Sequence, residues 1–155
     1  MKITIAAVGT RMPAWAEQAV HDYLARFPRG FEVSLKQVRP QPHTERGKAR
    51  ALRGEQAGVE AAVVGCDRLV ALDERGADWT TVQLSQAIAR WRDSAEHVAF
   101  LIGGADGLPA QLKERAALTL RLSSLTLPHA LARVVLVEQL YRAWSMLANH
   151  PYHRA

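Results

Sequence analysis

Short apolar runs alternate with amphipathic helical patterns along the whole 155-residue chain, and this alternation constrains the fold more than any other feature. Five segments have the apolar or alternating pattern typical of strands, namely residues 2–8, 31–38, 68–72, 97–102 and 118–122. Helical spacing predicts helices between them, near residues 13–27, 44–63, 80–92, from 109 onward and 129–148. The strict alternation predicts an α/β fold, with a mostly parallel sheet covered by helices on both faces.

Length and composition favour one compact domain over residues 1–155, with 48% hydrophobic residues. No apolar run reaches the length of about 18 residues that a membrane span needs. The N-terminal residues MKITIAAVGT are too short and too strand-like for a signal peptide. Cys66 is the only cysteine, so neither an internal disulfide nor a cysteine-rich metal site is expected. These features predict a cytoplasmic protein.

The basic residues are unevenly distributed within a net charge of +5. Residues 26–53 hold eight lysines and arginines against two acids, whereas residues 54–100 hold eight acids against four bases. Residues 101–155 return to six bases against three acids. Such segregation is typical of a surface that contacts a phosphate backbone. A solvated basic surface without a partner explains the charge equally well.

Three turns follow strands at the edge where open α/β sheets bind ligands, after Leu72, Ile102 and Leu122. The middle turn contains three glycines within residues 103–107, and glycine lets the backbone approach a ligand closely. Ala105 occupies the second glycine position of G-x-G-x-x-G, and no Gly-Lys pair is followed by Ser or Thr. Dinucleotide and nucleoside-triphosphate binding therefore lose support, while a tight turn without any ligand stays open.

The third turn, residues 123–129, is small and apolar rather than charged. Its backbone groups are suited to an adenine edge, with Leu122, Leu125 and Leu127 covering the ring. The alternative is a helix entry packed into the core, with a Ser or Thr cap.

The last helix is apolar on more than one stripe, which suits either a partner subunit or a deeply buried position. The tail after it, residues 149–154, concentrates two imidazoles, a phenol and a guanidinium. A metal site built from its histidines and His129 lacks a nearby acid or cysteine, so no metal is expected. Base stacking and phosphate contacts suit Tyr152, His153 and Arg154 better, and a merely exposed tail is the alternative.

Four segments of the chain are distinctive, namely LDERG, LIGGADGL, LSSLTLPHALARVVLVEQLYRAW and NHPYHR. Together with VGT and YLARFPR near the N-terminus, they resemble the RlmH family of ribosomal RNA methyltransferases in the SPOUT superfamily. The resemblance implies a SPOUT-type α/β knot, in which the C-terminal segment threads through a loop to form a trefoil knot. The general rarity of knots would otherwise favour an ordinary doubly wound sheet. The resemblance also implies a homodimer with cofactor sites near the subunit interface.

For activity, the resemblance implies S-adenosyl-L-methionine as methyl donor and no metal. The expected substrate is N3 of a pseudouridine in helix 69 of 23S ribosomal RNA, methylated on assembled ribosomes, with neither a membrane nor DNA as partner. The implied cofactor site coincides with the three turns identified from the strand pattern. Its residues are Leu72, Gly103, Gly104, Leu122, Ser123, Ser124, Leu125, Thr126 and Leu127.

Methyl transfer to N3 requires loss of the N3 proton, and cations or N–H donors would stabilise the resulting charge. The catalytic candidates are Arg142, Tyr152, His153 and Arg154. His153 is suited to act as general base near neutral pH, and orientation of the base by stacking is the alternative role. A non-catalytic RNA-binding protein and a SPOUT transfer-RNA methyltransferase are the competing functions.

Overall fold

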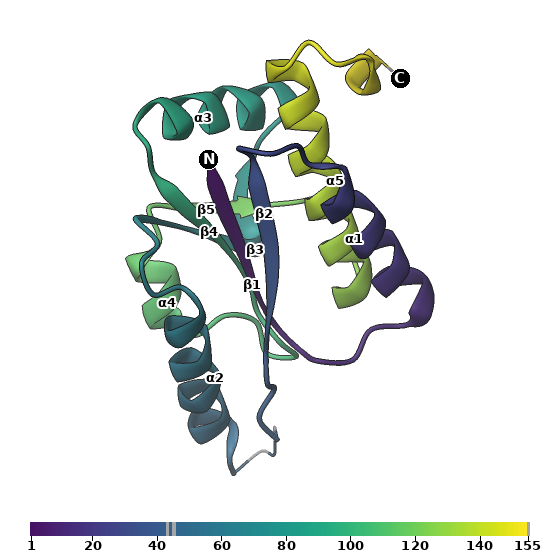
Figure 1. Cartoon of the computed structure of the whole chain (residues 1–155). Coiled ribbons are helices and arrows are strands. Elements are labelled where there is room, and N and C mark those ends of the chain that lie inside the picture. Colours follow the sequence, from purple (N-terminus) through teal and green to yellow (C-terminus); the bar gives the residue numbers. More distant parts are fainter. Residues whose placement is uncertain (43, 45, 155) are drawn as a thin grey trace.

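A five-stranded sheet with strand order β2-β1-β4-β3-β5 forms the centre of the computed structural model, which describes residues 1–42, 44 and 46–154 (Figure 1). All neighbouring strands are parallel, so their carboxyl ends meet at one edge. The strands are β1 (Lys2–Val8), β2 (Glu32–Val38), β3 (Arg68–Asp78), β4 (His97–Ile102) and β5 (Leu118–Arg121). The predicted parallel α/β architecture is confirmed; the trefoil knot stays a prediction.

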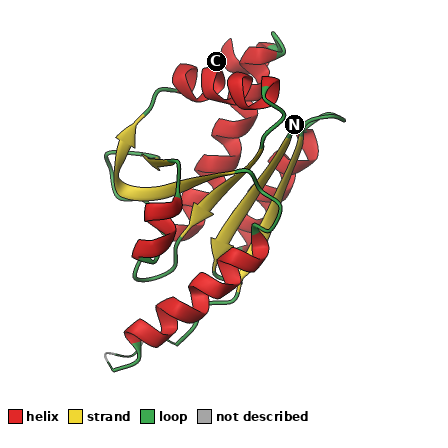
Figure 2. Cartoon of the chain, turned by 90° about the vertical axis from the view of Figure 1, so that its left-hand side faces the viewer, coloured by secondary structure: helices red, strands yellow, loops and turns green. Residues whose placement is uncertain are grey.

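Helices cover both faces of this sheet (Figures 1 and 2). One face packs against α1 (Ala14–Arg26), α3 (Thr81–Asp93) and α5 (His129–Leu147). The other packs against α2 (Lys48–Ala62) and the short α4 (Ala110–Arg115). A 3-10 helix, Pro151–Arg154, ends the described chain. Within the described residues, no helix is both long and apolar enough to cross a membrane.

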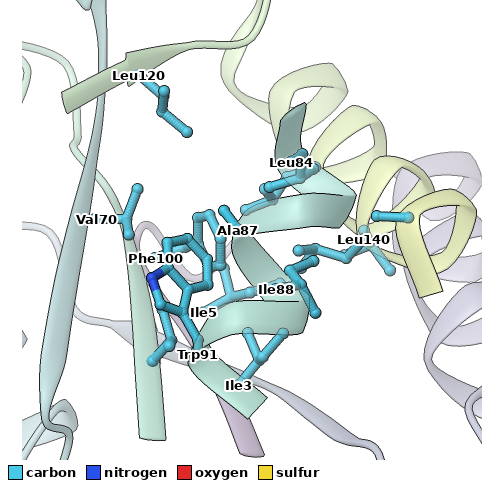
Figure 3. Packing of buried hydrophobic residues seen from close by; sticks show 14 of the residues in the cluster. Ile3, Ile5, Val70, Leu84, Ala87, Ile88, Trp91, Phe100, Leu120 and Leu140 are labelled. Carbon is cyan, nitrogen blue, oxygen red and sulfur yellow. The ribbon is translucent and has the colours of Figure 1, made fainter. Parts of the chain in front are cut away.

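Strand alternation divides the buried side chains between two cores. On β1, Ile3 and Ile5 face the α1/α3/α5 layer, whereas Ala6 and Val8 face the α2/α4 layer. Figure 3 shows the larger core, where Trp91 of α3 packs beside Phe100 of β4 at a ring separation of 6.2 Å. This packing on both faces leaves the strand ends as the place for a ligand.

Two helix starts refine the sequence predictions. Thr80 caps α3, since its hydroxyl accepts from the Gln83 N–H and the Gln83 side chain accepts from the Thr80 N–H. Helix α2 begins at Lys48 instead of residue 44, and Gly47 and Thr44 form a turn before it. His43 and Glu45, which the sequence assigned to the preceding loop and to this helix, lie outside the described residues.

Strand β3 continues through the residues that predict a turn, so the predicted end at Leu72 is wrong. Asp73 does form a local turn, because its Oδ1 accepts from the Arg75 N–H at 2.9 Å. Pairing with β5 nevertheless resumes at Ala77, and the intervening residues form a bulge. A Cβ at Gly76 would lie 2.4 Å from the Leu120 carbonyl carbon, so only glycine allows the two strands this approach.

Replacing Gly76 by Ala should therefore lower the free energy of unfolding by about 1–3 kcal/mol, because the new Cβ collides with rigid backbone. Urea unfolding followed by circular dichroism measures the change. Gly54→Ala is the control, since the three atoms nearest to its Cβ would all belong to the flexible Gln41 side chain and alanine favours the helix. Equal stability of the two variants would contradict the close β3–β5 approach.

Candidate functional site

A cavity of about 900 Å³ opens at the carboxyl edge of the sheet. The bulged part of β3 and the segments after β4 and β5 all line it, together with the end of β1, Pro40 and the first turn of α5. The sheet order brings these segments together, because β4 lies between β1 and β3, and β3 lies beside β5. Three segments that are distant in sequence therefore line one cavity.

Eight of the nine predicted cofactor residues line this cavity; Ser124 does not. Those on the wall are Leu72, Gly103, Gly104, Leu122, Ser123, Leu125, Thr126 and Leu127. The Ser123 hydroxyl accepts from the Leu125 N–H at 2.9 Å and thereby shapes the loop. The Leu125 side chain is 76% exposed, so a large apolar group stands at the cavity without cover.

Charged side chains also line the cavity, and sequence reasoning did not assign them to the site. Asp73 lines the cavity, and the Arg75 N–H bond together with the Lys113 ammonium at 3.3 Å holds its pKa below the usual range. The carboxylate is therefore ionised at neutral pH and can accept hydrogen bonds from hydroxyl groups. The signal was available in sequence, since Asp73 directly follows Leu72.

A buried arginine, Arg133, contacts three residues that line the cavity, Val8, Gly9 and His129. Arg133 has no exposed surface, and its Nη2 donates to the carbonyl oxygens of Val8 and Gly9 and to His129 Nε2 at 3.3, 2.8 and 3.0 Å. Its Nε and Nη1 have no hydrogen-bond partner among the described residues. Arg133 thus joins the end of β1 to the start of α5, and burial lowers its pKa.

The same contact fixes the protonation of His129, which lines the cavity. A guanidinium only donates, so His129 Nε2 must accept and the imidazole proton sits on Nδ1. Burial and the neighbouring Arg133 charge lower the His129 pKa. His129 therefore presents a neutral ring. A neutral ring is compatible with a hydrogen-bonding role and does not by itself support the metal-ligand role considered from the sequence.

This lowered pKa predicts acid sensitivity. Below about pH 6.5 the unfolded chain protonates His129 while the folded chain does not, so stability falls as pH decreases towards the lowered folded pKa. The variant His129→Gln should show a shallower loss of stability between pH 7.5 and pH 5.5 in urea unfolding. His21→Gln, at an exposed position on α1, is the control and should keep the wild-type slope. A wild-type slope in His129→Gln would contradict the assignment.

The predicted catalytic residues form a second group, at the C-terminal end of α5. Glu138 accepts from Arg142 Nε at 2.9 Å and from the Tyr152 hydroxyl at 3.0 Å. Tyr152 also contacts the Tyr23 hydroxyl at 2.9 Å. Burial and these two hydrogen bonds raise the Tyr152 pKa, so the phenol stays protonated at neutral pH. Arg142 and Tyr152 therefore anchor the tail helix.

His153 and Arg154 are the remaining members of this group. Arg154 is exposed. His153 is half-buried, and its Nδ1 is buried without a hydrogen-bond partner in the described part of the chain. Among residues 1–42, 44 and 46–154, His153 Nδ1 thus has no hydrogen-bond partner, and Arg154 is exposed.

The two groups are far apart within one chain. None of the four catalytic candidates, all of them described, lines the cavity. The cavity contacts the start of α5, whereas the tail follows its end, and a helix of 19 residues is about 28 Å long. Figure 1 shows the C-terminus of the chain at the opposite end of the molecule from the carboxyl ends of the strands. A ligand in the cavity cannot touch the tail of the same chain.

Comparison with known proteins identifies the family. The family model described as "Predicted SPOUT methyltransferase" matches residues 1–153. The ribosomal RNA large subunit methyltransferase H of Bordetella avium is 53% identical over 157 residues, covering 100% of both chains. The protein of the same name from Burkholderia thailandensis is 51% identical over 156 residues, again covering 100% of both.

A solved structure supports the fold. The probable methylase family protein from Haemophilus influenzae Rd KW20 superposes with a TM-score of 0.62 at 16% identity, covering 97% of this chain and 69% of that one. With the parallel sheet and the cavity at its carboxyl edge, the full-length sequence similarity settles the classification. The chain belongs to the SPOUT methyltransferase family, in the group of ribosomal RNA large subunit methyltransferases H.

Proposed function

We propose that the protein methylates large-subunit ribosomal RNA with S-adenosyl-L-methionine, at N3 of a pseudouridine in helix 69, on assembled ribosomes in the cytoplasm. The observation that supports this proposal is the cavity lined jointly by the β3 bulge and the turns after β4 and β5. The named activity of the full-length relatives supports the substrate class.

The residues of the cavity fit the proposed cofactor. SPOUT methyltransferases bind S-adenosylmethionine, and a volume of about 900 Å³ is within the range for a cofactor of that size. Leu122, Leu125 and Leu127 offer apolar cover to an adenine, and the ionised Asp73 offers an acceptor to ribose hydroxyls. When bound, the cofactor supplies an activated methyl group. The chain then needs chiefly to orient the target base and remove its proton.

Those tasks fall to the tail. His153 is the candidate acceptor for the N3 proton, and Arg154 is the candidate to stabilise negative charge on the flanking carbonyl oxygens. Tyr152 and Arg142 hold the tail helix against Glu138, so they act as positioning residues. A protonated Tyr152 cannot serve as the base.

The separation of cavity and tail favours a homodimer with shared sites. About 28 Å of helix α5 keep the tail of one chain from its own cavity. In a two-fold dimer the tail of the partner can reach that cavity, and the second site forms by symmetry. Each site would then combine the cofactor residues of one subunit with the tail of the other.

The deciding experiment incubates the purified protein with radiolabelled S-adenosylmethionine and intact ribosomes, free large subunits or transfer RNA. Label at a helix 69 pseudouridine, in intact ribosomes only, is the expected result. Label on transfer RNA would overturn the substrate. Absence of all label, together with no cofactor binding in calorimetry, would favour a non-catalytic RNA-binding protein.

The exposed Leu125 gives a specific test of cofactor binding. The variant Leu125→Ala should weaken cofactor binding about tenfold, since the cofactor would bury this side chain. Its thermal stability should match the wild type, because Leu125 contributes little burial to the free protein. Val82→Ala, at an exposed apolar position on α3, is the matched control. Unchanged affinity in Leu125→Ala would remove residues 122–127 from the site.

A further inference from the structure

The cavity and the tail leave one strongly charged surface without a role. Five exposed basic residues lie on the segment after β2 and on the first half of α2, and we call them the basic edge. They are Arg39, Arg46, Lys48, Arg50 and Arg53. From residue 39 to residue 54, the sequence contains only one acid, Glu45.

Most of the basic edge is not engaged in ion pairs. Elsewhere, Arg115 pairs with Glu60 at 2.9 Å and Arg142 pairs with Glu138 at 2.7 Å. Arg39, Arg46, Arg50 and Arg53 have no acidic partner within the described residues. These four guanidinium groups are exposed and have no ion pair within the described part of the chain, so they can contact phosphate oxygens.

Helix α2 presents Arg50 and Arg53 on one face. Ala51, Glu55 and Val59 form its buried stripe. Arg50 and Arg53 are three residues apart and lie on the opposite, exposed face. The arginines therefore do not contribute to the core, and their removal leaves the packing of α2 intact.

The basic edge lies beside the mouth of the cavity. Lys48 Nζ is 3.5 Å from Asp106 Oδ1, and Asp106 and Pro40 both line the cavity. Figure 1 shows α2 extending beyond the carboxyl ends of the strands. A nucleic acid that delivers a base to the cavity mouth would place its neighbouring phosphates along α2.

We propose that the basic edge, chiefly Arg50 and Arg53, binds the phosphate backbone of the ribosomal RNA next to the target base. The proposal rests on the proposed function for the identity of the RNA. The guanidinium groups position the RNA through its backbone and read no bases. They hold the substrate and take no part in methyl transfer.

The test compares two double variants of equal charge. Arg50→Ala/Arg53→Ala removes two cations from the basic edge, and Arg29→Ala/Arg90→Ala removes two exposed arginines near the amino ends of β2 and β4. Sedimentation with intact ribosomes between 50 and 300 mM KCl measures binding without requiring methylation. Calorimetry with S-adenosylmethionine and thermal unfolding report on the cavity and the fold.

The Arg50/Arg53 variant should bind ribosomes roughly tenfold more weakly, and the slope of log K against log salt should fall by about 1.4–1.8. Cofactor affinity and unfolding temperature should stay at wild-type values. The Lys-for-Arg double variant at the same positions should recover most of the binding, because a phosphate contact needs the charge. The Arg29/Arg90 variant should behave as the wild type.

Equal losses in both double variants, or a wild-type salt slope in Arg50→Ala/Arg53→Ala, would overturn this proposal. The proposed function fails in a different way, by absence of ribosomal label with the wild-type protein. If ribosome binding depends on Arg50 and Arg53 but no methylation occurs, the proposed role of the basic edge in RNA binding stands and the proposed methyltransferase activity is wrong.

Discussion

The variant Gly103→Ala should lose S-adenosylmethionine binding by at least about 100-fold, because the turn it would distort forms the cavity wall. A Cβ at this position would lie 2.3 Å from the Gly107 carbonyl carbon and 2.5 Å from the Leu108 nitrogen. Both atoms belong to backbone, which cannot move aside as a side chain does. The turn between residues 103 and 108 must therefore open, and its backbone groups leave their places.

Calorimetry with the purified variant measures the loss, and circular dichroism shows whether the sheet persists. Ala105→Gly is the control, since it alters the exposed apex of the same turn without adding an atom. If Gly103→Ala does not fold, Ala132→Trp provides a second variant, because Ala132 lines the cavity from α5. Wild-type affinity in either folded variant would place the cofactor elsewhere.

The variant His153→Ala should lower turnover by about 100-fold, the loss expected when a general base is removed. Cofactor affinity should remain at the wild-type value, because the proposed contact of His153 is with the target base and not with the cofactor. Single-turnover kinetics with ribosomes and calorimetry separate the two quantities. A pH profile adds a readout, because loss of a base abolishes the dependence on its ionisation. Equal losses in turnover and cofactor affinity would contradict a position at the target base.

Mixing two inactive variants tests whether the sites are shared. A heterodimer of His153→Ala with Ala132→Trp contains one site with both an open cavity and an intact tail. After subunit exchange, about a quarter of wild-type activity should return, since half of the dimers are mixed and each has one good site. No recovery from demonstrably mixed dimers would mean that each chain serves its own cavity.

The sequence predicted most of the residues of the cavity wall, because two of its three main segments follow the ends of strands. Glycines and small residues after apolar runs mark those ends, and the parallel order of an α/β sheet gathers them at one edge. The prediction that β3 ends at Leu72 was wrong because the residues after it, Asp73 to Gly76, carry signals that a turn and a strand bulge share. Only the pairing of Ala77 with Leu120 decides between them, and that contact spans distant parts of the chain.

Other features depended on tertiary packing. Arg133 stands in an otherwise apolar run, which marks it as unusual, yet its bonds to Val8 and Gly9 join residues more than 120 positions apart. The position of the tail relative to the cavity was partly accessible from sequence. Thirteen residues of helix separate His129 from Arg142, which already implies about 20 Å. The rise per residue of a helix therefore predicts that the cofactor residues and the catalytic candidates of one chain lie in two separate groups.

The length of α5 has a consequence for how activity depends on the amount of protein. If every site needs the tail of a neighbour, a lone chain holds cofactor and transfers nothing. Specific activity then falls on dilution below the dissociation constant of the dimer and approaches a first-order dependence on enzyme concentration, so that total rate becomes quadratic. A newly synthesised subunit would be inactive until it dimerises. A subunit with a defective tail would inactivate the site formed on the cavity of a wild-type partner.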